Sequence, residues 1–153
     1  MHVNTPPTPE LCNCLAIRQA ARHVSQLYDR YLAPTGLRGT QFSILAKLRR
    51  LGPTTINALA RDLVMDRTTL GRNILPLERE GLIEIVPGRR DRRSKEVHLT
   101  EQGTARLRQG LECWNEAQVR FETVFGAERA AELRGLMRAV TASEFGLGDN
   151  PAT

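Results

Sequence analysis

The sequence predicts a mainly α-helical α+β fold, with six helices and a two-stranded β-hairpin. Aromatic residues make up only 5% of the 153 residues, a proportion that fits a helical protein. Apolar residues recur at three- and four-residue steps through most of the chain, as they do on the buried face of a helix. Two short β-rich runs flank a single arginine-rich loop, which is the pattern of a hairpin.

The charge of the chain favours a polyanionic partner. It has 22 basic and 17 acidic residues, which gives a net charge of +5, and nearly all of the basic residues are arginines. A guanidinium group binds phosphate through two parallel hydrogen bonds. The basic residues are also unevenly spread, because five of them fall between Arg89 and Lys95.

Composition gives no sign of a membrane or of an oxidising environment. No run approaches the roughly 18 apolar residues of a membrane span, and the N-terminus lacks a basic region followed by an apolar run. Three cysteines are an odd number and too few for a secreted disulfide framework. We therefore expect a cytoplasmic protein with no membrane partner.

The first expected helix is unusually long. Residues 1–9 contain three prolines and are expected to be a flexible arm. The helical pattern then runs from Glu10 until Pro34 and Gly36 end it. Roughly 24 residues span about 35 Å, more than a small domain needs, so we expect this helix to pack against something outside its own domain.

A helix-turn-helix is expected next. One helix runs from Thr40 to Arg50 and is stopped by Gly52-Pro53. Thr55 can cap a short helix over residues 56–63, and Asp66 can cap another over residues 66–80. Two short helices joined by a turn of three or four residues form a helix-turn-helix, in which the second helix can enter the major groove of DNA.

The helix of residues 66–80 has one apolar and one polar face. Leu70, Ile74 and Leu77 form the core-facing stripe. The outward residues are of types that bond base edges and phosphates: Arg67, Thr68, Thr69, Arg72 and Asn73. A solvated face of any amphipathic helix has the same composition, so this face alone is a weak indication. Pro76 is expected to bend the helix or divide it in two.

The hairpin follows directly. Residues 82–86 and 95–99 are the two strands, and the loop between them is basic. A helix-turn-helix followed by such a hairpin is a winged helix, with residues 87–95 as the wing. Its charged loop residues are Arg89, Arg90, Asp91, Arg92 and Arg93. A merely solvated loop is the alternative, and the preceding helix-turn-helix argues against it.

The helices at the two ends of the chain predict a homodimer. Thr100 can cap a fifth helix, Gly126 breaks it, and a sixth helix follows before a flexible tail over residues 146–153. The apolar stripes of the terminal helices exceed what a winged helix of roughly 65 residues can cover. We therefore assign residues 10–36 and 100–145 to an intertwined dimerisation layer and residues 37–99 to the DNA-binding domain.

Several motifs resemble the MarR family of bacterial transcription regulators. They are Leu37-x-x-x-Gln41-Phe42, Asp66-Arg67, Leu77-Glu78-x-x-Gly81-Leu82-Ile83 and Asp91-Arg92-Arg93-Ser94-x-x-Val97-x-Leu99-Thr100, and the last is the specific one. The resemblance covers about residues 11–145. Arg38 departs from it, because family members often have Thr or Ser at that position to cap the helix.

The resemblance implies a two-fold dimer that reads a pseudo-palindromic duplex DNA site in adjacent major grooves. By position, Asp91 and Arg93 would shape the wing, while Arg89, Arg90 and Arg92 would enter the minor groove. Many members release DNA when a phenolic or other aromatic molecule binds, and others respond to thiol oxidation or to a metal. The resemblance therefore favours a regulator, here a repressor, that responds to a ligand or to redox conditions.

Two groups of residues are candidates for the signal. An inducer pocket on the first helix could use Arg18, Arg22, His23, Tyr28 and Tyr31, although tyrosines on such a stripe are more often interface core. A thiol sensor for oxidant, metal or metalloid could use Cys12, Cys14 and Cys113 across the dimer. Cysteine is among the most buried residue types, so a packing role is the interpretation that the residue type favours for Cys14.

Rival functions have less support. The chain has no P-loop, dinucleotide-binding or catalytic-triad motif, and its three histidines have no metal-ligand spacing, so we expect no enzyme, cofactor or metal site. A winged helix that serves only protein contacts would lack the arginine-rich wing. The sequence therefore favours a transcription regulator.

Overall fold

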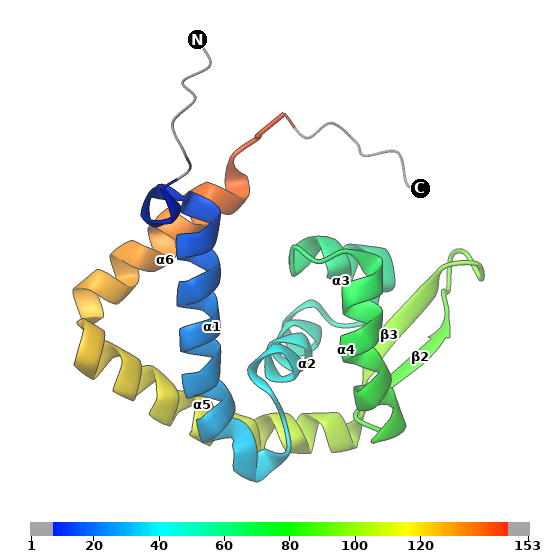
Figure 1. The fold of residues 1–153 in the computed structure, drawn as a ribbon. Helices are drawn as coiled ribbons and strands as arrows, with labels where there is room; N and C mark the ends of the chain where they lie inside the picture. The colour runs from blue at the N-terminus through cyan, green and yellow to red at the C-terminus, as the bar shows by residue number, and fades with distance from the viewer. Residues whose placement is uncertain (1–7, 147–153) are drawn as a thin grey trace. The chain divides into compact units, whose positions relative to one another are not determined.

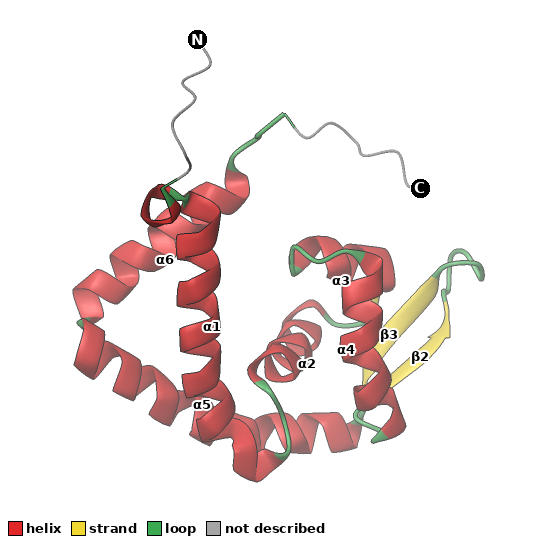
Figure 2. Ribbon diagram, viewed as in Figure 1, coloured by secondary structure: helices red, strands yellow, loops and turns green. Residues whose placement is uncertain are grey.

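The computed structural model describes residues 8–146 and contains the six predicted helices within that range (Figures 1 and 2). The helices are α1 (Asn13–Leu32), α2 (Gly39–Leu51), α3 (Ile56–Asp62), α4 (Arg67–Arg79), α5 (Glu101–Phe125) and α6 (Ala127–Ala142). The strands are β1 (Thr54–Thr55), β2 (Ile83–Pro87) and β3 (Lys95–Leu99). The mainly helical fold class is confirmed. Most of the predicted arm and tail lies outside the described residues.

The chain forms two compact units, Met1–Ala117 and Gln118–Thr153. The boundary falls inside α5, so the first two thirds of this helix belong to the unit that holds the winged helix. Of the described helices, none is long and apolar enough to cross a membrane.

The sheet has three strands rather than the predicted two. They are antiparallel in the order β1-β3-β2, and β3 pairs with β1 through Thr54 opposite Val97 and Thr55 opposite Glu96. The prediction missed β1 because two residues are too few to show the alternation of a strand. Thr55 also caps α3 by accepting the N–H of Ala58 at 3.1 Å, which confirms that predicted cap.

The first helix is shorter than predicted. Helix α1 has 20 residues because tight 3₁₀ turns occupy Pro9–Leu11 and Ala33–Thr35 at its two ends. The second turn ends at Gly36, whose φ of 76° lies in the left-handed region that glycine adopts at low cost.

Helix α2 begins two residues earlier than predicted. Its N-cap is Arg38, not Thr40, and the Arg38 N–H donates to Oε1 of Gln41 at 3.0 Å. The next N–H, that of Gly39, donates to Oδ1 of Asp29 in α1 at 2.7 Å. A carboxylate from the preceding helix therefore bonds a free N–H group of the first turn, which is the role of a capping side chain.

The core joins the winged helix to the end of α1 and the start of α5. Leu32 of α1 and Leu107 of α5 belong to the same buried cluster as Leu45, Leu70 and Val97. All five side chains are at most 1% exposed. The Phe42 ring of α2 also stacks on Trp114 of α5, with ring centroids 6.3 Å apart. The buried core of the winged helix therefore includes side chains from α1 and α5.

Helix α5 approaches its neighbours through two glycines seven residues apart. A Cβ atom at Gly103 would overlap the carbonyl oxygen of Leu82, and one at Gly110 would lie 2.8 Å from Cδ2 of Phe42. Residues seven apart lie on one face of a helix. Only a backbone without side chains at these two positions allows α5 to lie so close to Leu82 and to α2.

We predict that Gly103→Ala destabilises the protein by about 3 kcal/mol, because the new methyl group forces the start of α5 away from Leu82. Gly71→Ala in α4 is the matched control, since nothing lies within 4 Å of a Cβ placed there. That change should stabilise the protein by about 0.5–1 kcal/mol, the helix-propensity difference. Urea unfolding followed by circular dichroism measures both. Equal stability of wild type and Gly103→Ala would contradict the close approach.

Candidate DNA-binding surface

The turn between α3 and α4 has the geometry of a helix-turn-helix. The N–H of Met65 donates to the carbonyl oxygen of Ala60 at 2.8 Å, and that of Val64 donates to Arg61 at 3.1 Å. This pair of bonds is a Schellman motif, which needs one residue in the left-handed conformation. Val64 occupies that position with a φ of 55°, and its side chain is 72% exposed. A β-branched residue is strained there, and burial does not compensate it.

Asp66 caps α4, as predicted. Its carboxylate accepts the Thr69 N–H at 2.7 Å and the Thr69 hydroxyl at 2.9 Å. The bond from the Thr69 backbone, followed by the bond from its hydroxyl, lowers the pKa of Asp66 from its ordinary value of 3.8. The carboxylate is therefore ionised at neutral pH and complements the positive end of the helix dipole.

The two faces of α4 are arranged as predicted. Leu70, Ile74 and Leu77 are at most 3% exposed and face the core. The exposed polar residues of the opposite side are Arg67, Thr68, Thr69 and Arg72. Asn73 differs, because it is half-buried and its amide donates to the carbonyl oxygen of Thr69 at 2.8 Å. One donor of Asn73 is thus engaged by its own helix.

Pro76 does not divide the helix, so that part of the prediction is wrong. Helix α4 continues to Arg79, and the Pro76 carbonyl oxygen accepts the N–H of Glu80 at 3.1 Å. A proline removes only the bond that its own nitrogen would donate, and the last turn retains its other bonds. Gly81, with a φ of 74°, then ends the helix.

The wing is a closed loop between β2 and β3. The Gly88 N–H donates to Ser94 at 2.6 Å and the Ser94 N–H to the backbone of Asp91 at 3.0 Å. The Asp91 carboxylate accepts the backbone N–H of Arg93 at 3.0 Å. Asp91 therefore bonds to the backbone of Arg93. A Cβ at Gly88 would lie 2.6 Å from the Asp91 carbonyl oxygen, so this turn requires glycine.

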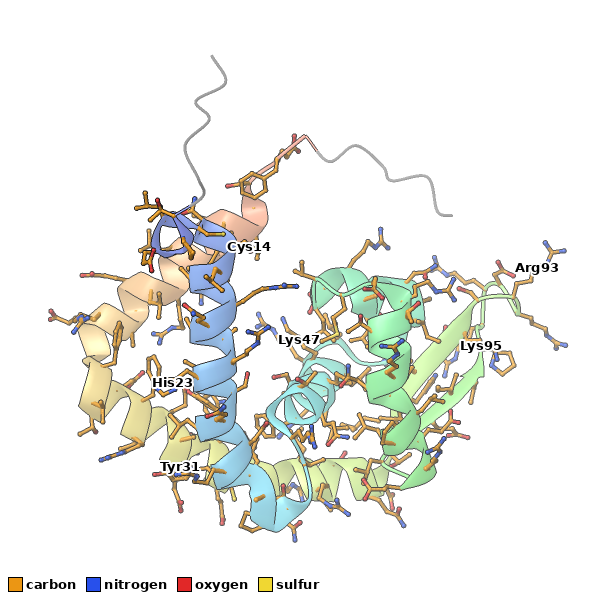
Figure 3. All side chains as sticks on the ribbon, in the orientation of Figure 1. Cys14, His23, Tyr31, Lys47, Arg93 and Lys95 are labelled. Atoms are coloured by element: carbon orange, nitrogen blue, oxygen red, sulfur yellow. The ribbon has the colours of Figure 1, made fainter. Side chains whose placement is uncertain are left out.

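The charged side chains of the wing face solvent. Arg89, Arg90, Arg92 and Arg93 are all exposed, and none of the ion pairs found within residues 8–146 involves them. Figure 3 shows Arg93 and Lys95 projecting from the hairpin. Their charges are thus available to an external anion such as phosphate.

Two further side chains at the base of the wing were not predicted. Oε1 of Glu96 accepts the backbone N–H of Arg89 at 3.3 Å. Oε2 of the same carboxylate lies 3.1 Å from Nε2 of His98. Side chains alternate along β3, so both residues lie on the face opposite buried Val97. This alternation is the sequence pattern that could have indicated them.

The proposed inducer residues on α1 do not share one side of that helix. Arg18, Arg22 and His23 are exposed, while Tyr28 and Tyr31 are half-buried. Successive residues turn by about 100°, so Arg22 and Tyr31, nine residues apart, lie on opposite sides. Figure 3 shows His23 and Tyr31 at different heights along α1. One chain alone therefore does not gather this set into a pocket.

A cavity of about 430 Å³ lies elsewhere, between α3, α4 and the sheet. Its lining is largely apolar, with one carboxylate and one ammonium group: Ile56, Gly71, Ile74, Leu75, Glu78, Ile85 and Lys95.

The three cysteines are free and differ in their surroundings. Cys12 caps α1, because its Sγ accepts the N–H of Leu15 at 3.4 Å. Cys14 is exposed in the single chain, and Figure 3 shows it near the start of α1. Cys113 is half-buried against the core. Among residues 8–146, no group of His, Cys, Asp or Glu could hold a metal ion.

The helix-turn-helix, the three-stranded sheet and the basic loop together define a winged helix. A model of the MarR family matches residues 37–95, which include the whole helix-turn-helix and the wing. This chain belongs to the MarR family.

The relatives that it resembles are regulators. The transcriptional activatory protein BadR of Rhodopseudomonas palustris is 37% identical over 101 residues, which are 61% of this chain and 57% of BadR. The match thus spans little more than half of BadR. These relatives are named as transcription regulators, which confirms the prediction that the chain is not an enzyme.

Solved structures match over more of the chain. The M. tuberculosis transcriptional regulator MosR in complex with DNA is 35% identical, with a TM-score of 0.74 over 86% of this chain and 97% of that one. A mutant of E. coli MarR complexed with operator DNA is 25% identical, with a TM-score of 0.74 over 82% of this chain and 90% of that one.

We predict that Val64→Asn stabilises the protein by about 1 kcal/mol, because asparagine accepts the left-handed conformation at lower cost. Val64→Thr is the matched control: threonine is also β-branched, keeps the strain and should leave the stability unchanged. Thermal unfolding of the three proteins measures the difference. An equal gain in stability for both variants would mean that removal of the exposed apolar side chain, and not relief of backbone strain, stabilises the protein.

Proposed function

We propose that the protein is a transcription regulator that binds duplex DNA as a homodimer, through residues 66–80 and the wing of residues 87–95. The observation that carries this proposal is the set of four exposed wing arginines in the hairpin directly after a helix-turn-helix, none of which joins an ion pair found within residues 8–146. Helix α4 presents polar residues that suit base edges and phosphates. The similarity to MosR, whose structure contains DNA, supports the assignment.

The second compact unit supports the homodimer. Within it, α6 has a single buried side chain, Ala130. In proteins most helical stability comes from the packing of an apolar face, so α6, with 16 residues and one buried side chain, needs a packing partner. The unit also exposes large apolar side chains, each between 37% and 71% exposed: Val119, Val124, Leu136, Met137, Val140 and Phe145. We propose that a second copy of the chain covers these side chains. A homodimer carries two recognition helices, and a separation of about 34 Å between them would match the half-sites of a pseudo-palindromic site.

The proposed signal is a small aromatic or phenolic molecule that releases the repressor from DNA. Because α1 alone does not gather Arg18, Arg22, His23, Tyr28 and Tyr31 on one side, a pocket that uses them would need residues from the partner chain. Exposed Cys12 and Cys14 keep oxidation as the alternative signal. A triple Cys→Ser variant that still responds to the effector would exclude the thiols.

The experiment that tests the function has two steps. Duplexes are first selected from a random library with the purified protein, and the affinity for the selected duplex and for a random duplex is then measured by fluorescence anisotropy. Sedimentation gives the stoichiometry, and a reporter gene behind the selected site gives the sign of regulation. Absence of a salt-dependent affinity for any duplex would refute the proposal.

We predict that Arg92→Ala weakens binding to every duplex alike, because a wing contact to phosphate carries little sequence information. The slope of log K against log salt should fall in magnitude by about 0.9, the value for one neutralised phosphate. Arg108→Ala, which removes an exposed arginine of α5 outside the wing, is the control and should keep the wild-type slope. An unchanged slope in Arg92→Ala would exclude this arginine from the interface.

We predict that Arg72→Ala reduces the preference for the selected duplex over random DNA. A bidentate contact to a base contributes about 1–3 kcal/mol of discrimination, so the preference should fall at least about fivefold. The measurement is the ratio of the two affinities at one salt concentration, with Arg92→Ala as the comparison that should keep this ratio. If Arg72→Ala lowers both affinities equally, its contact is to phosphate only.

A further inference from the structure

Glu96 and His98 form a bonded pair directly beneath the wing. Both lie on β3, two residues apart and therefore on one face of the sheet. Their side chains are only 19% and 25% exposed, respectively. Val97 between them is fully buried on the other face. The pair is thus fixed in position by a strand that belongs to the core.

Glu96 also bonds to Arg89, the first arginine of the wing. Its Oε1 accepts the Arg89 N–H at 3.3 Å, across the hairpin from β3 to the loop. In the strand register Glu96 lies opposite Val86, three residues before Arg89. The carboxylate therefore holds the backbone at the point where the chain leaves β2 for the wing. The bond from His98, followed by that from Arg89, lowers the pKa of Glu96.

The bond from His98 orients the Glu96 carboxylate. Nε2 of His98 lies 3.1 Å from Oε2, while Oε1 of the same carboxylate accepts the Arg89 N–H. A carboxylate bonded through both oxygens has one orientation, and in this orientation it holds the backbone of Arg89.

On the proposed function, phosphates approach the loop of four arginines. A contact from Arg89 to phosphate then depends on where the backbone of that residue lies.

We propose that Glu96, oriented by His98, is a positioning residue for Arg89. This proposal rests on the proposed DNA-binding function and assigns a role at the base of the wing.

The positioning role is tested with two neutral substitutions. Glu96→Gln keeps an oxygen that can accept the Arg89 N–H, whereas Glu96→Ala does not. We expect Glu96→Ala to bind about fivefold more weakly than Glu96→Gln, the value of one such hydrogen bond. In an Arg89→Ala background this difference should disappear, which a general loss of folding would not produce. Equal affinities of the two variants would overturn the positioning role. Absence of DNA binding by the wild type would instead refute the proposed function itself.

Discussion

The contact between the backbone of α5 and Leu82, the residue before β2, determines how α4 and the wing are held. The Gly103 N–H donates to Oγ1 of Thr100 at 3.0 Å, and that hydroxyl donates to the carbonyl oxygen of Gly81 at 2.6 Å. The Thr100 N–H donates to Leu82 at 3.1 Å. One threonine thus caps α5 and bonds the residues that end α4. The absence of a side chain at Gly103 is the condition for this approach.

The same few residues connect all parts of the candidate site. The Leu82 N–H donates to the Leu77 carbonyl oxygen in the last turn of α4 at 2.9 Å, and β2 begins at the next residue. A displacement of α5 would therefore move the end of α4 and the base of the wing together. For this reason the orientation of α4 relative to the wing depends on packing in the core and not on the exposed loop.

Much of this arrangement could be predicted from the sequence because its signals are local. The cap at Asp66, the stripe of Leu70, Ile74 and Leu77, and the arginine-rich hairpin each depend on residues a few positions apart. The bond from Gly39 to Asp29 and the close approach at Gly103 could not be predicted, since each joins segments that are distant in the chain. The bond from the Arg89 N–H to Glu96 crosses the hairpin. It depends on the register of the two strands, which the periodicity of the sequence alone does not give.

On the proposed function, the bonds within α4 also limit which of its side chains are free to contact bases. The Thr69 hydroxyl donates to Asp66, and the Asn73 amide donates to the Thr69 carbonyl oxygen, so both side chains have donors engaged within the helix. A side chain with its donor already bonded must break that bond before it can donate to a base, which reduces the net gain. Arg67, Thr68 and Arg72 are exposed and incur no such cost. On the proposed function, base discrimination would therefore depend mainly on these three residues, while the wing would contribute affinity that is largely independent of sequence.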